Sequence, residues 1–322
     1  MQRMMTRRSV LHASLGAAGA SACAGFLASL ISPRAFAKSA ATPITSTKLA
    51  EDLFLFQGAG GNVVVAKGGD GLLLVDGGSP ERSSELLKRV SAETGERRVA
   101  QLVNTHWHWD HTGSNEVLAK SGAQILAHEN TKLWLGTEII SKWEGRTYEP
   151  RPANALPTQT FFYDADAKPL MFGEQKLEYG VMPGAHTDGD LYVFFPRQNV
   201  VVGGDVISGG EYPIVDYVTG GWLGGMIGGL KAILKKGDAN TRFVPGSGAL
   251  RTRADLEAQI DVCFTALSKI GDSYYKGQTW NELVASAPMR DFDARWGNPE
   301  TFLRLAYEGA WNHINEIRRV TR

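Results

Sequence analysis

The stretch that decides the fold is Val99-Ala100-Gln101-Leu102-Val103-Asn104, followed by Thr105-His106-Trp107-His108-Trp109-Asp110-His111-Thr112-Gly113. The first six residues form a short apolar run, which predicts a buried strand. Side chains alternate in direction along a strand, so the two rings of the His-x-His end point to the same side. A helix is expected next, near Asn115–Lys120, and the nitrogen and oxygen donors therefore gather at a strand-to-helix corner.

The donors at this corner are imidazoles and a carboxylate, without a thiolate. This set suits zinc better than the softer metals that prefer cysteine. The alternative is a polar loop whose histidines only form hydrogen bonds. Three histidines and an aspartate within six residues, directly after a strand, favour the metal site.

The H-x-H-x-D-H motif of residues 106–111 resembles the signature of the metallo-β-lactamase superfamily. The resemblance implies an α/β fold, an αββα sandwich of two mixed β-sheets with external helices, with the metals at one edge. The strand predictions agree with two β-rich halves. Residues 62–75 and 190–202 each predict an apolar hairpin that ends in an acid at a glycine-rich corner, Asp76 and Asp205.

The first 37 residues predict a targeting segment. Thr6-Arg7-Arg8-Ser9-Val10-Leu11 resembles a twin-arginine export signal, an Ala- and Gly-rich apolar run follows, and Ala35-Phe36-Ala37 supplies a cleavage pattern. We expect export to the periplasm and cleavage, which leaves no stable membrane anchor. An uncleaved anchor is the alternative.

Composition bounds the partners and the redox chemistry. The chain has 34 Lys plus Arg and 34 Asp plus Glu, and four of the arginines lie in the targeting segment, so the mature chain is mildly acidic. We therefore expect no basic face for binding nucleic acid. The expected partner is a small-molecule substrate. Only Cys263 remains after cleavage, so no intramolecular disulfide can form, and its apolar helical surroundings predict a core residue.

Residues 38–250 are predicted to form the metallo-β-lactamase-like domain, and residues 251–322 a C-terminal helical extension. The extension has helical apolar spacing near 254–270, and further helices are expected near 280–286 and 299–319. It is expected to cover the sandwich, and a homodimer contact or a cap over the site are further roles open to it. The stretch 134–160, rich in Pro, Trp and charge, predicts a long ordered loop.

The remaining ligands are predicted mainly from the resemblance. His186 lies in the turn Pro183-Gly184-Ala185-His186-Thr187-Asp188-Gly189-Asp190, which is similar to the turn of the third histidine in the superfamily. The resemblance implies a first site of His106, His108 and His186, and a second of Asp110, His111 and Asp205. Asp205 would bridge the two metals. Asp76 is predicted either to orient a ligand histidine or to form a turn.

The chain departs from the superfamily pattern at one ligand. The pattern closes with a histidine in a P-G-H-G turn, and the turn here reads Pro245-Gly246-Ser247-Gly248. A neutral hydroxyl is a poor zinc ligand, so we expect Ser247 to bind a water and the second metal to bind weakly. One zinc, two zincs and iron all stay open.

The predicted reaction is hydrolysis of an ester, thioester, lactone or lactam by metal-bound hydroxide, with Asp110 as the catalytic residue that orients it and takes a proton. The glycine-rich loop 208–225 is expected over the site, with Tyr212 and Trp222 near the substrate. Trp107 and Trp109 are candidates for lining the mouth, with packing in the core as the alternative, and the opposite wall is expected from Trp143, Tyr148 and residues 150–157. The alternatives are a mononuclear iron oxidoreductase of persulfide-dioxygenase type, with His106, His186 and Asp205 on iron, and a non-catalytic metal-binding protein.

Overall fold

Two β-sheets form the centre of the structure, a computed structural model that describes residues 42–162 and 168–320. The first sheet contains, from edge to edge, β1 (Thr45–Ala50), β2 (Leu53–Ala59), β3 (Gly61–Gly68), β4 (Gly71–Val75), β5 (Val99–Val103), β6 (Gln124–His128) and β9 (Gln159–Phe161). The second contains β10 (Lys168–Phe172), β11 (Gln175–Val181), β12 (Leu191–Phe195), β13 (Val200–Gly204) and β14 (Arg242–Pro245). A separate hairpin is formed by β7 (Ile139–Ser141) and β8 (Arg146–Tyr148).

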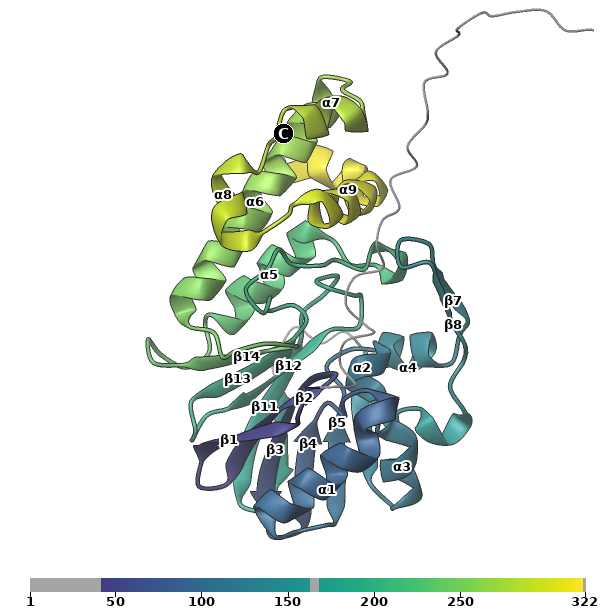
Figure 1. Cartoon of the computed structure of the whole chain (residues 1–322), viewed down its shortest axis with the longest axis vertical. Helices are drawn as coiled ribbons and strands as arrows, with labels where there is room; N and C mark the ends of the chain where they lie inside the picture. The colour runs from purple at the N-terminus through teal and green to yellow at the C-terminus, as the bar shows by residue number, and fades with distance from the viewer. Residues whose placement is uncertain (1–41, 163–167, 321–322) are drawn as a thin grey trace, which may run out of the picture. The chain divides into compact units, whose positions relative to one another are not determined.

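Helices cover the outer face of each sheet (Figure 1). The helices of the first half are α1 (Ser83–Thr94), α2 (Trp109–Thr112), α3 (Asn115–Lys120) and α4 (Glu129–Leu135), and those of the second are α5 (Leu223–Ile233), α6 (Arg253–Tyr275), α7 (Trp280–Ala285), α8 (Arg290–Trp296) and α9 (Glu300–Val320). The order helix, sheet, sheet, helix confirms the predicted αββα sandwich.

Alternation along the strands divides the buried side chains among three apolar layers. In β3, Val64 faces the layer between the sheets, while Val63 and Val65 face the layer under α1 and α3. In β12, Phe195 faces the inner layer, and Phe194 faces the layer shared with α5 and α6. Each sheet is therefore buried on both faces, which explains why its central strands are almost wholly apolar.

The two halves repeat one pairing pattern. The antiparallel hairpin β3–β4 continues into the parallel pair β4–β5, and the antiparallel hairpin β12–β13 continues into the parallel pair β13–β14. Strands that run parallel end at the same edge of a sheet, so polar residues after β4, β5, β13 and β14 are carried to one end of the sandwich.

Short and polar elements differ from the sequence-based expectation. The stretch 134–160 contains the hairpin β7–β8 and the edge strand β9 instead of one long loop. Strands of three residues are too short to show a period of two, which is why they left no pattern. The edge strand β1 and the helix α8 were not predicted either, because half or more of each is polar.

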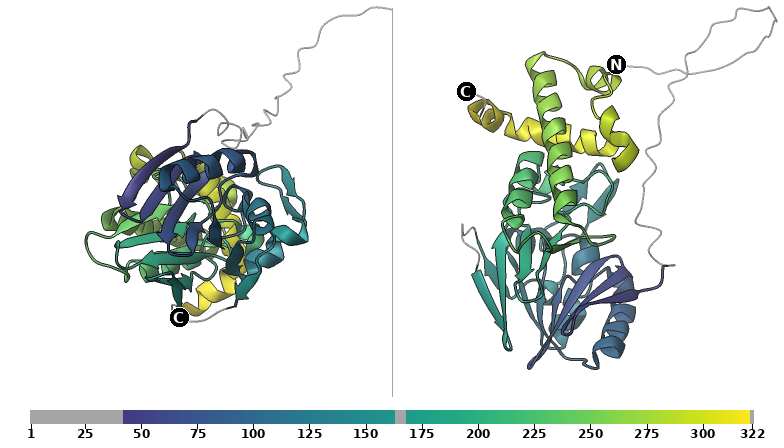
Figure 2. Two further views of the ribbon diagram at one scale, coloured as in Figure 1. Left: turned by 90° about the horizontal axis from the view of Figure 1, so that it is seen from below. Right: turned by 90° about the vertical axis from the view of Figure 1, so that its left-hand side faces the viewer.

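The C-terminal helices pack on α5 and on each other, and Figure 2 shows them together beyond one end of the sheets. All described residues belong to one compact unit. Cys263 on α6 is fully buried, as expected for a core residue, and burial raises the pKa of its thiol. The predicted signal peptide lies outside the described residues. Of the described helices, none combines the length and the apolar character that crossing a bilayer requires.

Phe195 should carry much of the stability of the layer between the sheets, because its ring is fully buried there. Phe195→Ala is expected to lower the free energy of unfolding by about 3–5 kcal/mol. Phe264→Ala is the matched control, since that ring is 61% exposed on α6, and it should change stability by less than about 0.5 kcal/mol. Urea denaturation measures both, and equal losses would contradict the assigned core.

Candidate metal centre

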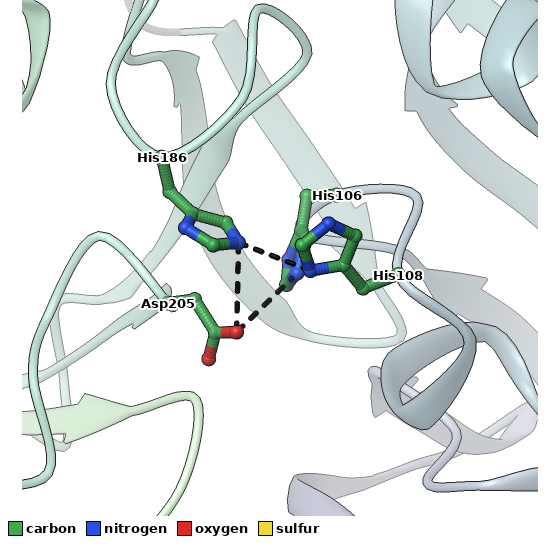
Figure 3. Close-up of side chains that lie close together, drawn as sticks. All are labelled: His106, His108, His186 and Asp205. Carbon is green, nitrogen blue, oxygen red and sulfur yellow. Dashed lines mark hydrogen bonds and ion pairs between the residues drawn. The ribbon is translucent and has the colours of Figure 1, made fainter. Parts of the chain in front are cut away.

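The candidate ligands come from four positions at the same edge of the sandwich: the loops after β5, β11 and β13, and the helix α2. His106 and His108 follow β5, and α2 carries Asp110 and His111. Strands β11 and β13 both run antiparallel to β12, so the turn after β11 that holds His186 meets the corner after β13. Figure 3 shows the three histidines and Asp205 pointing toward one another from these separate loops.

Four of these side chains meet closely enough to share one ion. The ligand atoms of His106, His108, His186 and Asp205 all lie within 4.8 Å of one another. Nε2 of His186 is 3.1 Å from Nδ1 of His108, and Oδ2 of Asp205 is 3.6 Å from Nε2 of both His106 and His186. The set is three imidazoles and one carboxylate, a combination that zinc binds readily.

Hydrogen bonds on the outer side of two rings decide which nitrogen faces inward as an acceptor. Nδ1 of His186 lies 2.8 Å from the carbonyl oxygen of Ile214, and Nε2 of His108 lies 3.1 Å from Oδ2 of Asp216. A carbonyl or a carboxylate only accepts, so each ring places its proton on the outer nitrogen. Two lone pairs then face each other across 3.1 Å, which is repulsive unless a proton or a cation lies between them.

The other two rings are oriented through Asp76, which follows β4. Its carboxylate accepts from the backbone N–H and the hydroxyl of Thr105, both at 2.8 Å, and from Nδ1 of His111, also at 2.8 Å. Since the Thr105 hydroxyl proton is directed to Asp76, Oγ1 accepts from Nδ1 of His106 at 3.0 Å. Asp76 therefore has the orienting role that the sequence left as one of two options.

The inner nitrogens of these two rings are left without hydrogen bonds. Nε2 of His106 and Nε2 of His111 are buried and have no hydrogen-bond partner in the described part of the chain. A buried acceptor without a partner costs about 1–3 kcal/mol, and the other ordinary way to satisfy an imidazole nitrogen is a metal ion. The orphaned nitrogens and the donor set fit a metal.

The electrostatics of the cluster favour a cation at its centre. Burial and the neighbouring His111 hold the pKa of His106 well below its usual value, and burial with His108 lowers that of His186, so both rings are neutral ligands at pH 7. Burial raises the pKa of Asp205, but the nearby charge of His111 reverses this and holds it well below normal. The charges of Asp205 and Asp76 overcome burial at His111 and raise its pKa well above normal.

Asp205 stands between two groups of donors. One carboxylate oxygen faces His106 and His186, while the other lies 3.4 Å from Nε2 of His111. Asp110 is next to that nitrogen, with 3.9 Å between Oδ2 and Nε2. Asp205 thus faces both groups of donors at once.

The turn after β14 meets Asp205 through its backbone. A Cβ atom at Gly246 would collide with Oδ1 of Asp205, so only glycine fits there. At Gly204, φ is +56° and a Cβ would lie 2.6 Å from Oγ1 of Thr105, which again requires glycine. Ser247 is exposed in the same turn, which Asn62 holds by donating to the carbonyl groups of the residues at 245 and 248.

The structure adds a residue that the sequence did not single out as a site residue. Asp216 is buried and accepts hydrogen bonds from His108, from the hydroxyl of Thr219 at 2.6 Å and from the backbone N–H of Val218 at 3.1 Å. Nε1 of Trp107 in turn donates to Oγ1 of Thr219 at 3.0 Å. The only sequence signal was an acid three residues before a threonine in the loop predicted over the site, and such turns are common.

The C-terminal helices hold the loop that carries Asp216. Gln259 on α6 donates to the carbonyl oxygen of Val206 and accepts from the backbone N–H of Ser208, both at 2.9 Å. Tyr212 is 7% exposed, and its hydroxyl donates to Asp293 on α8 at 2.9 Å. Tyr212 thereby anchors the loop to the helices.

Trp222 lies at the other end of this loop. Its backbone N–H reaches the carbonyl oxygens of Gly184 and Ala185, both at 3.1 Å, and its ring stacks on His313 of α9 with a centroid distance of 4.5 Å. It therefore links α9 to the turn of His186. His128 is also outside the metal cluster, because its Nδ1 accepts from the backbone N–H of Asn130 at the start of α4.

Asp216 should tune metal binding without being a ligand. Asp216→Asn removes the charge that orients His108 and is expected to weaken metal affinity about 10–100-fold, because partners that orient a ligand ring typically contribute that much. Competition with a fluorescent chelator measures the affinity. Glu211→Gln makes the same charge change at an exposed position of the same loop and should have no effect. Equal effects of the two variants would remove Asp216 from the centre.

Known sequences similar to this chain cover the part that holds the candidate ligands. Residues 57–261 match the sequence profile of the Metallo-beta-lactamase superfamily. A Metallo-beta-lactamase type 2 from Bacillus cereus is 24% identical over 201 residues, 62% of this chain and 72% of that protein. One from Bacillus sp. (strain 170) is 26% identical over 201 residues, with the same coverage.

Solved structures show the same fold. A metallo-beta-lactamase from Pontibacter korlensis superposes with a TM-score of 0.55 at 18% identity, over 69% of this chain and 99% of that one. The sec-alkylsulfatase Pisa1 from Pseudomonas sp. superposes with a TM-score of 0.63 at 16% identity, over 82% of this chain and 50% of that one. The 82% of this chain that superposes on Pisa1 is more than residues 1–250 contain, so this similarity extends into the C-terminal helices. On the profile match over more than half of its length, this chain belongs to the metallo-β-lactamase superfamily.

Proposed function

We propose that this chain is a zinc-dependent hydrolase that opens an ester, thioester, lactone or lactam. The observation that carries the proposal is the convergence of imidazole lone pairs with Asp205, each ring held by an outer hydrogen bond. The superfamily and this cluster support metal-dependent hydrolysis in general. Zinc and the carbonyl substrate are the finer part of the proposal.

A bound zinc would act as a Lewis acid and would lower the pKa of a bound water to roughly 7, so that hydroxide is available at neutral pH. His106, His108 and His186 would hold it as neutral nitrogen ligands, and Asp205 would bring the negative charge. Asp110, 19% exposed at the edge of the cluster, is positioned to accept a proton. Asp76 and Asp216 keep the rings fixed.

We also propose that the protein works in the periplasm. The proposal is supported by the twin-arginine pattern and the cleavage pattern within residues 1–37. Comparing the cellular fraction that contains the protein with and without Arg7→Lys and Arg8→Lys tests this. Loss of export in the double variant is the expected result.

Elemental analysis and a substrate panel test the reaction class. Zinc at one or two ions per chain, with turnover of a thioester, an aryl ester, a lactone or a chromogenic lactam, supports the proposal. Iron at one ion per chain would favour the oxidoreductase alternative, in which His106, His186 and Asp205 form the ligand set. A secondary alkyl sulfate belongs in the panel, because the similarity to the sec-alkylsulfatase extends into the C-terminal helices.

Removing His186 should abolish binding at the first site. His186→Ala leaves a cavity where the third nitrogen stood, and we expect at least a hundredfold loss of metal affinity and loss of activity. His128→Asn is the control, because asparagine keeps an acceptor for the start of α4 and lies outside the cluster. Full metal content in the His186 variant would remove this residue from the ligand set.

Restoring the histidine of the family turn should strengthen the second site. In Ser247→His the Pro-Gly-x-Gly turn is otherwise intact, and Gly246 already contacts Asp205, so a new imidazole is added in the turn beside that carboxylate. The expected result is a rise in bound metal toward two ions per chain. Unchanged stoichiometry, read by elemental analysis, would show that position 247 is not the place of a lost ligand.

A further inference from the structure

A cavity of about 360 Å³ is lined on one side by Trp107 and by Trp109 and Thr112 of α2. Helix α4 and the hairpin β7–β8 form its other walls. The ring of Trp107 lies 4.5 Å from that of His108 and 5.1 Å from that of Tyr148. One aromatic ring therefore separates the cavity from a candidate metal ligand, and the size is that of a small-molecule site.

The cavity contains a guanidinium that two rings hold in place. The Cζ atom of Arg146 is 4.5 Å from the ring centroid of Trp109 and 4.6 Å from that of Tyr148. The hydroxyl of Tyr148 donates to both carboxylate oxygens of Glu144, at 2.9 and 3.0 Å, which fixes one of the rings. Contacts with ring faces leave the N–H edge of a guanidinium available, and that edge matches a carboxylate.

The charges around the cavity favour an anion at Arg146. Arg151 supplies a second guanidinium to the lining, and Glu81 and Glu149 supply two carboxylates. Within residues 42–162 and 168–320, no ion pair joins either arginine to an acid. The lining charges balance, so the preference for an anion comes from Arg146 alone, because the two rings already position its guanidinium.

The aromatic walls of the cavity indicate what the apolar part of the ligand is. Trp109, Trp134 and Tyr148 present ring surface, and Leu135 adds an aliphatic side chain. Such walls bind flat apolar groups by stacking and burial. Trp109 and Thr112 are the residues of α2 that line the cavity, so a group bound there contacts the helix that carries Asp110.

We propose that this cavity is the recognition pocket for the substrate, and that it takes an aromatic or acyl group bearing a carboxylate. The carboxylate pairs with Arg146, the apolar body lies against the indole rings, and the scissile group extends past α2 to the metal cluster. This proposal rests on the proposed function only in that it calls the ligand a substrate. Binding in the cavity can be measured without turnover.

Tryptophan fluorescence of the metal-loaded protein tests it with two probes of equal shape, 2-naphthoate and 2-naphthamide. The naphthoate should bind more tightly to the unchanged protein. Arg146→Gln should weaken naphthoate binding at least about tenfold and naphthamide binding less than about twofold. Lys142→Gln is the control, because it removes one exposed positive charge from the same hairpin outside the cavity and should change neither.

Arg146→Lys separates charge from geometry, since the ammonium keeps the charge and loses the flat fork; intermediate affinity is expected. Equal binding of naphthoate to the unchanged protein and to Arg146→Gln would overturn the proposal. The carboxylate would then bind at another place, such as the metal. Absence of saturable binding to the unchanged protein would overturn it too. If naphthoate binding depends on Arg146 but the protein hydrolyses none of the substrates in the panel, the proposed function is refuted and the binding pocket is supported.

Discussion

The site depends on the outer hydrogen bonds of four imidazoles. His186 is held by a main-chain carbonyl, His108 by Asp216, His111 by Asp76, and His106 by Thr105, which itself donates to Asp76. Each bond places the proton of its ring away from the cluster, so the lone pairs converge on one space. Once the inner nitrogens carry no proton, their lone pairs repel one another, and a divalent cation turns the repulsion into ligation.

Holding the rings this way involves most of the molecule. Asp76 follows β4 of the first sheet, whereas Asp216 belongs to the loop between the second sheet and α5. Gln259 and Asp293, on α6 and α8, hold that loop by hydrogen bonds to Val206, Ser208 and Tyr212. The C-terminal helices thus act on the metal centre through the backbone that precedes and follows Asp216. Among the described residues of these helices, none places a side chain in the cluster, so the helices act on it through the loop that they hold.

The apolar pattern predicted the central strands to within one or two residues, and it failed at the edges. Strands such as β3 and β12 are buried on both faces, so nearly every residue had to be apolar and the pattern was strong. The strand β1 and the hairpin β7–β8 are partly exposed, and their pairing comes from neighbours that local sequence does not reveal. The hairpin also forms one wall of the candidate recognition pocket, so that wall was not predictable from the sequence either.

The sequence by itself determined the donor chemistry. The spacing of His106, His108, Asp110 and His111 after a strand holds for any placement of the rest of the chain, because side-chain direction over a few residues follows from local backbone geometry. Only the tertiary structure decided that the rings carry their protons outward, that Asp216 supports His108, and that Asp205 faces two groups of donors at once. Those relations join residues about 30 to 110 positions apart, and contacts at such separations depend on how the sheets pack, not on neighbouring residues.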